Sequence, residues 1–207
     1  MPVRIVTDSS ADLPADEVAR LGVEVVPLSI RFGAEEFTDG VDLSVAQFYD
    51  KLASSSDLPE TAAPAPGAFE AAFRRQAAAG ADAVVCINLS SGLSATFQSA
   101  QNAATAVADD VDVRVVDSRS ITSGLGTQVT VAAEAAAEGA SADEVVALVD
   151  GLVGRTHVIG ALDTLDNLKK GGRIGGAQAL LGSLLSIKPL LDISNPLQPR
   201  RIDDVAD

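Results

Sequence analysis

The most constraining feature of this sequence is a regular alternation of short aliphatic runs with segments that carry helix signals. Residues 3–7, 83–89 and 113–116 are rich in β-branched side chains, and the second run (AVVCINL) is apolar almost throughout. Apolar strands separated by helices are typical of parallel sheets that helices cover on both faces. Aromatic residues make up only 3% of the chain, so the core must consist of Val, Leu, Ile and Ala. We therefore predict an α/β fold whose parallel sheet lies between two layers of helices.

Capping residues and proline set the expected boundaries of the helices. Ser44 with Gln47 and Ser141 with Glu144 have the spacing of capping boxes, which begin helices. The predicted helices span residues 14–22, 44–54, 66–79, 92–108, 123–138 and 143–153, and a second strand spans 23–30. A hairpin is expected around Gly33, and the proline-containing residues 54–67 are expected to form an extended loop.

The pattern changes near residue 155, where we predict a domain boundary. Beyond it we expect a strand over residues 157–162, a short helix over 164–170, an apolar helix over 178–185 and a final strand over 187–193. The first domain is then residues 1–155 and the second is 156–207.

Charge and composition exclude several classes of protein. The chain has 29 acidic against 15 basic side chains, a net charge of −14, which disfavours nucleic acid and anionic membrane surfaces as partners. Asp8 and Asp12 interrupt the segment where a signal peptide needs its apolar core, and no apolar run reaches 18 residues. The single Cys86 excludes a disulfide scaffold. A cytoplasmic location is the expectation.

Three predicted strands end in turns that are rich in hydroxyl groups and precede helices. The turns are residues 7–10 (TDSS), 90–94 (SSGLS) and 117–118 (DS). Ligands of open α/β sheets bind beyond the carboxyl ends of the strands, where helix N-termini offer free N–H groups to anions. Ser and Asp are also ordinary capping residues, so each turn alone is ambiguous. Together, the three turns favour a site for an anion of low charge.

A serine hydrolase is the alternative that belongs to another class. Ser94 lies between a strand and a helix, where a nucleophile elbow would lie, and Asp117 and His157 follow in the order of a hydrolase triad. Thr96 occupies the position where the elbow motif has Gly, and His157 begins an apolar run. These two departures weigh against the triad, but the sequence does not exclude an esterase or lipase that uses Ser94, Asp117 and His157. One His and one Cys make a zinc site improbable, and we expect neither a metal nor a cofactor.

The motifs of this chain, in their order, resemble those of the DegV family of fatty-acid-binding proteins. The matching stretches are IVTDSSADLP (5–14), LPETAAPAPGAF (58–69), NLSSGLSATFQSA (88–100), VVDSRSITSGLG (115–126), LDTLDNLKKGGRIG (162–175) and ALLGSLLSIKPLL (179–191). The resemblance implies a non-catalytic carrier that holds one long-chain fatty acid, its tail in an apolar tunnel and its carboxylate near the surface. It also implies a partner, a separate fatty-acid kinase that phosphorylates the bound acyl group.

The resemblance assigns roles to individual residues. The family's carboxylate contacts correspond to Thr61 and Ser94, and an Arg that the family uses in docking with the kinase corresponds to Arg173. Ser9 and Ser118 are additional candidate donors around the head group.

Three departures from the family pattern are visible. Ala62 and Ala63 replace the Ser and Gln that usually follow the Thr, and Ala95 replaces the Gly that usually follows the Ser. Family chains continue well past Leu191. We therefore expect residues 156–207 to be a shortened α/β second domain that lines part of the tunnel.

Overall fold

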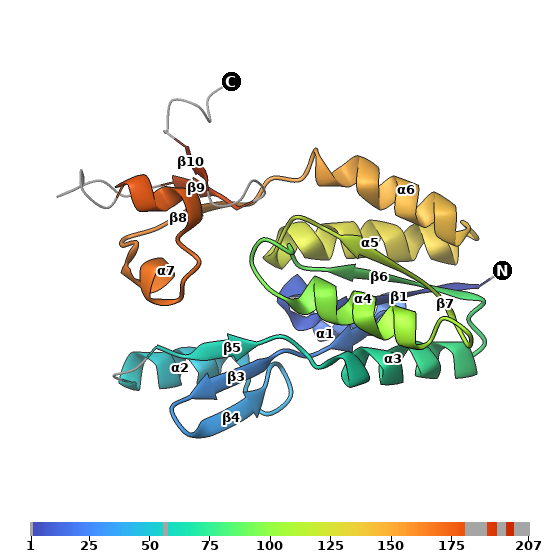
Figure 1. The fold of residues 1–207 in the computed structure, drawn as a ribbon, viewed down its shortest axis with the longest axis horizontal. Helices are drawn as coiled ribbons and strands as arrows, with labels where there is room; N and C mark the ends of the chain where they lie inside the picture. The colour runs from blue at the N-terminus through green and yellow to red at the C-terminus, as the bar shows by residue number, and fades with distance from the viewer. Residues whose placement is uncertain (1, 56–57, 181–189, 194–197, 201–207) are drawn as a thin grey trace.

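A four-stranded parallel sheet lies at the centre of the larger lobe of the computed structural model, which describes residues 2–55, 58–180, 190–193 and 198–200 (Figure 1). The strand order is β2-β1-β6-β7, with β1 at Val3–Asp8, β2 at Glu24–Val26, β6 at Ala83–Asn88 and β7 at Asp112–Asp117. Every residue of β6 is buried, as its apolar sequence predicts. All three pairings are parallel, so β1, β6 and β7 end at the same edge of the sheet.

Helices cover both faces of this sheet, which confirms the predicted α/β class. The helices of this lobe are α1 (Ala15–Leu21), α3 (Pro66–Ala78), α4 (Thr96–Ala106), α5 (Thr122–Ala137) and α6 (Ala142–Val153). One face packs Val85 and Ile87 against Leu125 and Val129 of α5 and against Val145 and Val149 of α6. The other face packs against α3 and α4. We call this α/β/α unit the parallel-sheet lobe.

A second, antiparallel sheet forms a small β lobe that the sequence did not separate from the first domain. It consists of β3 (Ser29–Phe32), β4 (Glu35–Thr38) and β5 (Glu60–Ala62) in the order β4-β3-β5, with α2 (Val45–Ser54) beside them. Phe32 packs with Phe48 of α2 at a ring-centroid distance of 5.8 Å. The hairpin predicted around Gly33 is confirmed as β3–β4.

Two predictions about this region are wrong. Residues 23–30 do not form one strand, because Pro27 has no N–H for a ladder, and the chain changes sheets between β2 and β3. Residues 54–67 are not loop throughout, because Glu60–Ala62 pair with β3 as the edge strand β5. The three residues of β5 are all exposed, so no pattern of buried side chains marks them in the sequence.

The described residues beyond α6 form a C-terminal lobe around a third sheet. Its strands are β8 (Ile159–Ala161), β9 (Leu190–Asp192) and β10 (Gln198–Arg200), in the antiparallel order β10-β9-β8, with α7 (Asp166–Lys170) and the 3-10 helix η2 (Gly175–Leu180). Leu165, Ile174, Ala177 and Leu191 form its cluster of buried hydrophobic residues. The predicted helix over 178–185 and the start of the strand over 187–193 lie outside the described residues.

Both predicted capping boxes are present. In each, the Ser side chain accepts a hydrogen bond from the third backbone N–H of the helix, and the Gln47 or Glu144 side chain accepts one from the Ser N–H. Within the described ranges, no helix combines the length and the apolar character that crossing a bilayer requires.

Candidate functional site

The carboxyl ends of β1, β6 and β7 carry the three turns that the sequence predicts as an anion site. Thr7 is opposite Ile87, and Asn88 is opposite Asp117, so the turns begin at the same level of the sheet. β6 lies between β1 and β7, and the turn that follows it leads into α4. The central turn is therefore flanked by the other two, in the position where open α/β sheets bind ligands.

Asp8 holds the central turn from the β1 side. Its carboxylate is fully buried and accepts hydrogen bonds from Leu89 N (2.9 Å) and Asn88 Nδ2 (3.1 Å). It also accepts from Ser10 N (3.1 Å) and Ser10 Oγ (2.5 Å) in its own turn. Burial raises the pKa of the Asp8 carboxyl, and the hydrogen bonds oppose that rise. Asp8 thus connects two turns that are 80 residues apart in the chain.

Asp117 holds the same turn from the β7 side. Its carboxylate accepts hydrogen bonds from Ser91 N (3.2 Å) and Ser91 Oγ (2.6 Å), and from Arg119 N (3.0 Å). From the sequence, Asp8 and Asp117 are expected at strand ends, but that both carboxylates bind the turn between them is visible only in the structure. The signal that could have indicated it is the Asp at the end of each flanking strand, followed by Ser.

Ser94 lies at the end of this braced turn, immediately before α4. It is half-buried, its N–H donates to Ser90 O (3.2 Å), and its Oγ accepts from Thr96 N (3.3 Å). Ser94 Oγ and Thr96 Oγ1 are hydrogen-bonded at 2.9 Å, and either hydroxyl can be the donor. The Ser94 hydroxyl therefore binds the first backbone N–H of α4, and it can still donate or accept one further hydrogen bond.

Thr61 lies in the small β lobe, in the segment that precedes Pro64. It is exposed in β5, opposite Ile30 of β3. The loop that follows is fastened to α4, because the buried Ser99 Oγ donates to Pro64 O at 2.5 Å. Ser99 comes five residues after Ser94, and Pro64 comes three residues after Thr61. The buried Ser99–Pro64 hydrogen bond therefore joins the two segments that contain the predicted carboxylate ligands.

Ser9 and Ser118 have backbone partners in the structure. Ser9 Oγ accepts a hydrogen bond from Leu28 N at 3.0 Å, which joins the β1 turn to the segment before β3. Ser118 is fully buried, and its Oγ accepts from Ser120 N at 3.1 Å and donates to Ser120 O at 3.3 Å. These bonds shape the turns, and the role of either hydroxyl toward a ligand stays a prediction.

Arg173 extends from the C-terminal lobe to the Ser94 turn. It is exposed, its Nε donates to Leu93 O at 3.4 Å, and its Nη1 donates to Gly171 O at 2.7 Å. The resemblance to the DegV family implies that Arg173 faces a protein partner. In the structure its guanidinium contacts Leu93, the residue immediately before the predicted carboxylate ligand Ser94.

The residues of the alternative triad have other partners. Ser94 Oγ pairs with Thr96, the Asp117 carboxylate accepts from Ser91 and Arg119, and His157 Nδ1 lies 3.7 Å from Asp192 Oδ2. A hydrolase needs the His to accept a proton from the Ser and to donate to the Asp of the same relay. In the structure, Ser94 and Asp117 make contacts within turns, and His157 contacts a residue of the C-terminal lobe, so these contacts do not connect the three side chains as a triad.

Close packing at the start of α5 completes this edge of the sheet. Gly124 and Gly126 face other segments so closely that a Cβ would lie 2.3 Å from Ser120 Oγ in the first case and 2.5 Å from Ala11 O in the second. Ser120 Oγ and Gln128 Oε1 are buried polar atoms that find no hydrogen-bond partner among the described residues. Within the described part of the chain, no group of three or more His, Cys, Asp or Glu side chains has the geometry to hold a metal ion.

Comparison with known proteins gives a consistent result. The family model described as an uncharacterised protein of the DegV family matches residues 2–199. A DegV domain-containing protein of Deinococcus radiodurans is 41% identical over 191 residues, which are 92% of this chain and 67% of that protein. One of Streptomyces coelicolor is 40% identical over 92% of this chain and 67% of its own length.

Solved structures share the fold. A DegV family protein from Thermus thermophilus, described for its fatty acid binding, superposes with a TM-score of 0.86 at 36% identity over 100% of this chain and 74% of its own. A fatty-acid-binding DegV protein from Bacillus subtilis superposes with a TM-score of 0.86 at 31% identity, over 100% of this chain and 74% of its own. A stearic-acid-binding protein from Eubacterium ventriosum gives 0.86 at 27% identity, over 98% and 72%. This chain therefore belongs to the DegV family.

Proposed function

We propose that the protein binds one long-chain fatty acid and holds its carboxylate with Ser94 and Thr61. The observation that carries this proposal is the buried Ser99–Pro64 hydrogen bond, which joins the segments of the two hydroxyl groups at the carboxyl edge of the sheet. The fatty-acid-binding relatives with TM-scores of 0.86 support the ligand class.

The chemistry of the edge suits a carboxylate. Neutral hydroxyl groups at the start of a helix can donate to an anion of single charge without the cluster of cations that a phosphate usually recruits. The affinity would come chiefly from the tail. A sixteen-carbon chain buries about 15 methylene groups at roughly 0.8 kcal/mol each, before the costs of ordering the ligand. Head-group contacts then fix orientation and select the ligand.

The role that fits such a site is that of a carrier. A carrier without chemistry of its own presents the carboxylate to a separate, ATP-dependent fatty-acid kinase in the cytoplasm. The contacts of Asp117 and His157 support a carrier over the esterase, because both side chains have structural partners. No cofactor is needed, and the fatty acid is the ligand.

Lipid extraction tests the proposal directly. Freshly purified protein is extracted with organic solvent, and the extract is analysed by mass spectrometry. We expect close to one long-chain fatty acid per chain, less of it with Ser94→Ala, and an unchanged amount with Ser141→Ala, which removes a helix cap on α6. Absence of fatty acid, with none taken up on incubation, would overturn the proposal.

A parallel assay separates the carrier from the esterase. The carrier hydrolyses no short-chain nitrophenyl ester. Hydrolysis that both Ser94→Ala and His157→Ala abolish would favour the esterase instead.

A further inference from the structure

Residues 154–158 form the linker that connects α6 of the parallel-sheet lobe to β8 of the C-terminal lobe. Two of its side chains, Thr156 and Val158, rest against α5, because a Cβ on Gly124 would lie 3.3 Å from the first and 2.4 Å from the second. Thr156 Oγ1 also donates to Leu152 O of α6 at 2.9 Å. The linker is therefore held on the parallel-sheet lobe by packing and by a hydrogen bond.

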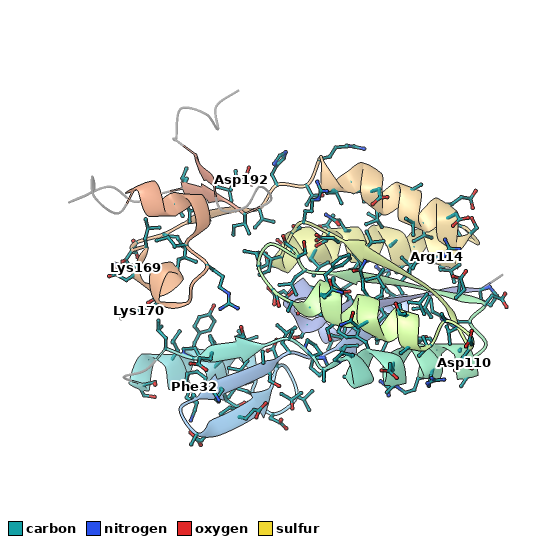
Figure 2. The ribbon with its side chains drawn as sticks, viewed as in Figure 1. Phe32, Asp110, Arg114, Lys169, Lys170 and Asp192 are labelled. Atoms are coloured by element: carbon teal, nitrogen blue, oxygen red, sulfur yellow. The ribbon has the colours of Figure 1, made fainter. Side chains whose placement is uncertain are left out.

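His157, between these two residues, contacts the C-terminal lobe instead. Its Nδ1 lies 3.7 Å from Oδ2 of Asp192 in β9, and Figure 2 shows Asp192 where the linker enters that lobe. The backbone joins the same segments, since Ile193 N donates to Val158 O at 2.9 Å. The His157–Asp192 contact therefore lies at the point where the C-terminal lobe is attached to the linker.

The two side chains of this pair differ in burial. The side chain of Asp192 is 2% exposed, whereas that of His157 is 52% exposed. A buried carboxylate is costly unless polar or charged groups stabilise it. The residues opposite Asp192 in the sheet are uncharged, Ile159 in β8 and Gln198 in β10. His157 gives this buried carboxylate a neighbour whose charge can change.

The charge of this neighbour depends on pH in a range where the surrounding charges do not. His157 is the only histidine of the chain, and histidine is the side chain that ordinarily changes its charge between pH 5 and 8. The nearest charged residues along the surrounding segments are acidic side chains or arginines, which ordinarily keep their charges in this range. They are Arg155 on the linker, Asp150 on α6, Arg119 before α5, Asp163 after β8 and Arg200 on β10.

We propose that His157 and Asp192 form a pH-dependent latch that fastens the C-terminal lobe to the linker. When the imidazole is protonated, its charge attracts the buried carboxylate and stabilises the pairing of β8 with β9. When the imidazole is neutral, this attraction is lost, while the bond from Ile193 N to Val158 O remains. The stabilisation is therefore present at pH 5.5 and lost as the pH rises to 8. It acts on the lobe itself, whatever ligand the protein binds.

Native-state hydrogen exchange of the full chain, followed by mass spectrometry, measures the local opening of this lobe. Protection factors, which remove the pH dependence of intrinsic exchange, are compared for the amides of β8 and β9 at pH 5.5 and 8. The proteins are wild type, His157→Gln, His157→Lys and Arg155→Gln. Arg155→Gln is the matched control, because it removes a positive charge from an exposed side chain two residues away on the same linker. Thermal unfolding of each variant checks that the fold is retained.

The expected result is a pH dependence that follows His157. In wild type, protection of β8 and β9 should be roughly two- to fivefold higher at pH 5.5 than at pH 8, as for a partly exposed ion pair. His157→Gln should remove this difference, His157→Lys should keep the higher protection at both pH values, and Arg155→Gln should leave the difference unchanged. The amides of β6 should respond to neither His157 variant. No difference in wild type, a difference that persists in His157→Gln, or an equal loss at both pH values would overturn the latch.

Discussion

Replacing Gly126 by Ala tests how tightly α5 packs on the turn after β1. An ideal Cβ on Gly126 would lie 2.5 Å from the carbonyl oxygen of Ala11 and 3.3 Å from Leu13 Cδ2. The first contact is with backbone, which cannot rotate away as a side chain does. Because this turn also contains Ser9, which binds the segment before β3, any shift of α5 is transmitted to the candidate site.

Gly151 supplies the matched control. It lies inside α6, and a Cβ there would meet nothing within 4 Å. Ala is preferred to Gly in a helix interior by about 0.8–1.0 kcal/mol, so Gly151→Ala should raise the free energy of unfolding by up to that amount. Gly126→Ala has the same helical gain but adds an overpacking cost of typically 1–3 kcal/mol. The difference between the variants therefore isolates the packing cost, about 1–3 kcal/mol.

Urea denaturation followed by circular dichroism measures both changes. For a chain of this size, 1 kcal/mol corresponds to a shift in Tm of roughly 2–4 °C, so thermal unfolding gives a second readout. We expect Gly151→Ala to be more stable than wild type and Gly126→Ala to be less stable. Equal stabilisation by both substitutions would refute the close approach of α5 to Ala11.

Three further predictions concern charge, a buried hydrogen bond and a helix cap. Burial and the nearby charge of Asp39 raise the pKa of Asp12, so its ionised form costs stability above that pKa. Because Asp12 is exposed, Asp12→Asn should stabilise the protein only slightly at pH 7, by less than about 0.5 kcal/mol, in a left-handed conformation (φ 50°) that Asn tolerates. Unfolding measured against pH should show this gain disappearing as the pH falls through the raised pKa, and a constant gain would contradict it. Ser99→Ala leaves the buried Pro64 carbonyl without its donor, which should cost about 1–3 kcal/mol in urea denaturation and also weaken fatty-acid binding. Ser141→Ala removes a cap at a cost of about 1 kcal/mol, and calorimetric titration should show unchanged ligand affinity; a parallel loss of affinity in both Ser variants would contradict a local effect of Ser99.

Local signals predicted the elements that local interactions decide. The apolar run of β6 and the two capping boxes are formed as expected, because burial on both faces and Ser-to-backbone bonds depend on neighbouring residues. The predictions that were wrong concern segments whose structure depends on a partner distant in the sequence. β5 is a strand because it pairs with β3, about 30 residues earlier, and its own three side chains are exposed.

The candidate site also combines residues that the sequence identified with contacts that only the structure shows. The family motifs placed Thr61, Ser94 and Arg173, but the bonds that bring their segments together join positions far apart in the chain. The Asp8 carboxylate reaches Leu89 across 81 residues, and the Arg173 side chain reaches Leu93 across 80. Rules based on short sequence spacings do not predict such contacts. The binding of the central turn by the carboxylates of Asp8 and Asp117 is therefore seen only in the structure.

The most direct test of the central claim follows the carboxylate itself. Hexadecanoate labelled with carbon-13 at its carboxyl carbon is bound to delipidated protein and observed by NMR. We predict one bound carboxyl resonance, distinct from that of free ligand, which shifts in Ser94→Ala and in Thr61→Ala and keeps its position in Ser141→Ala. Absence of a bound resonance, or a bound resonance that neither Ser94→Ala nor Thr61→Ala moves, would contradict the placement of the head group at this edge of the sheet.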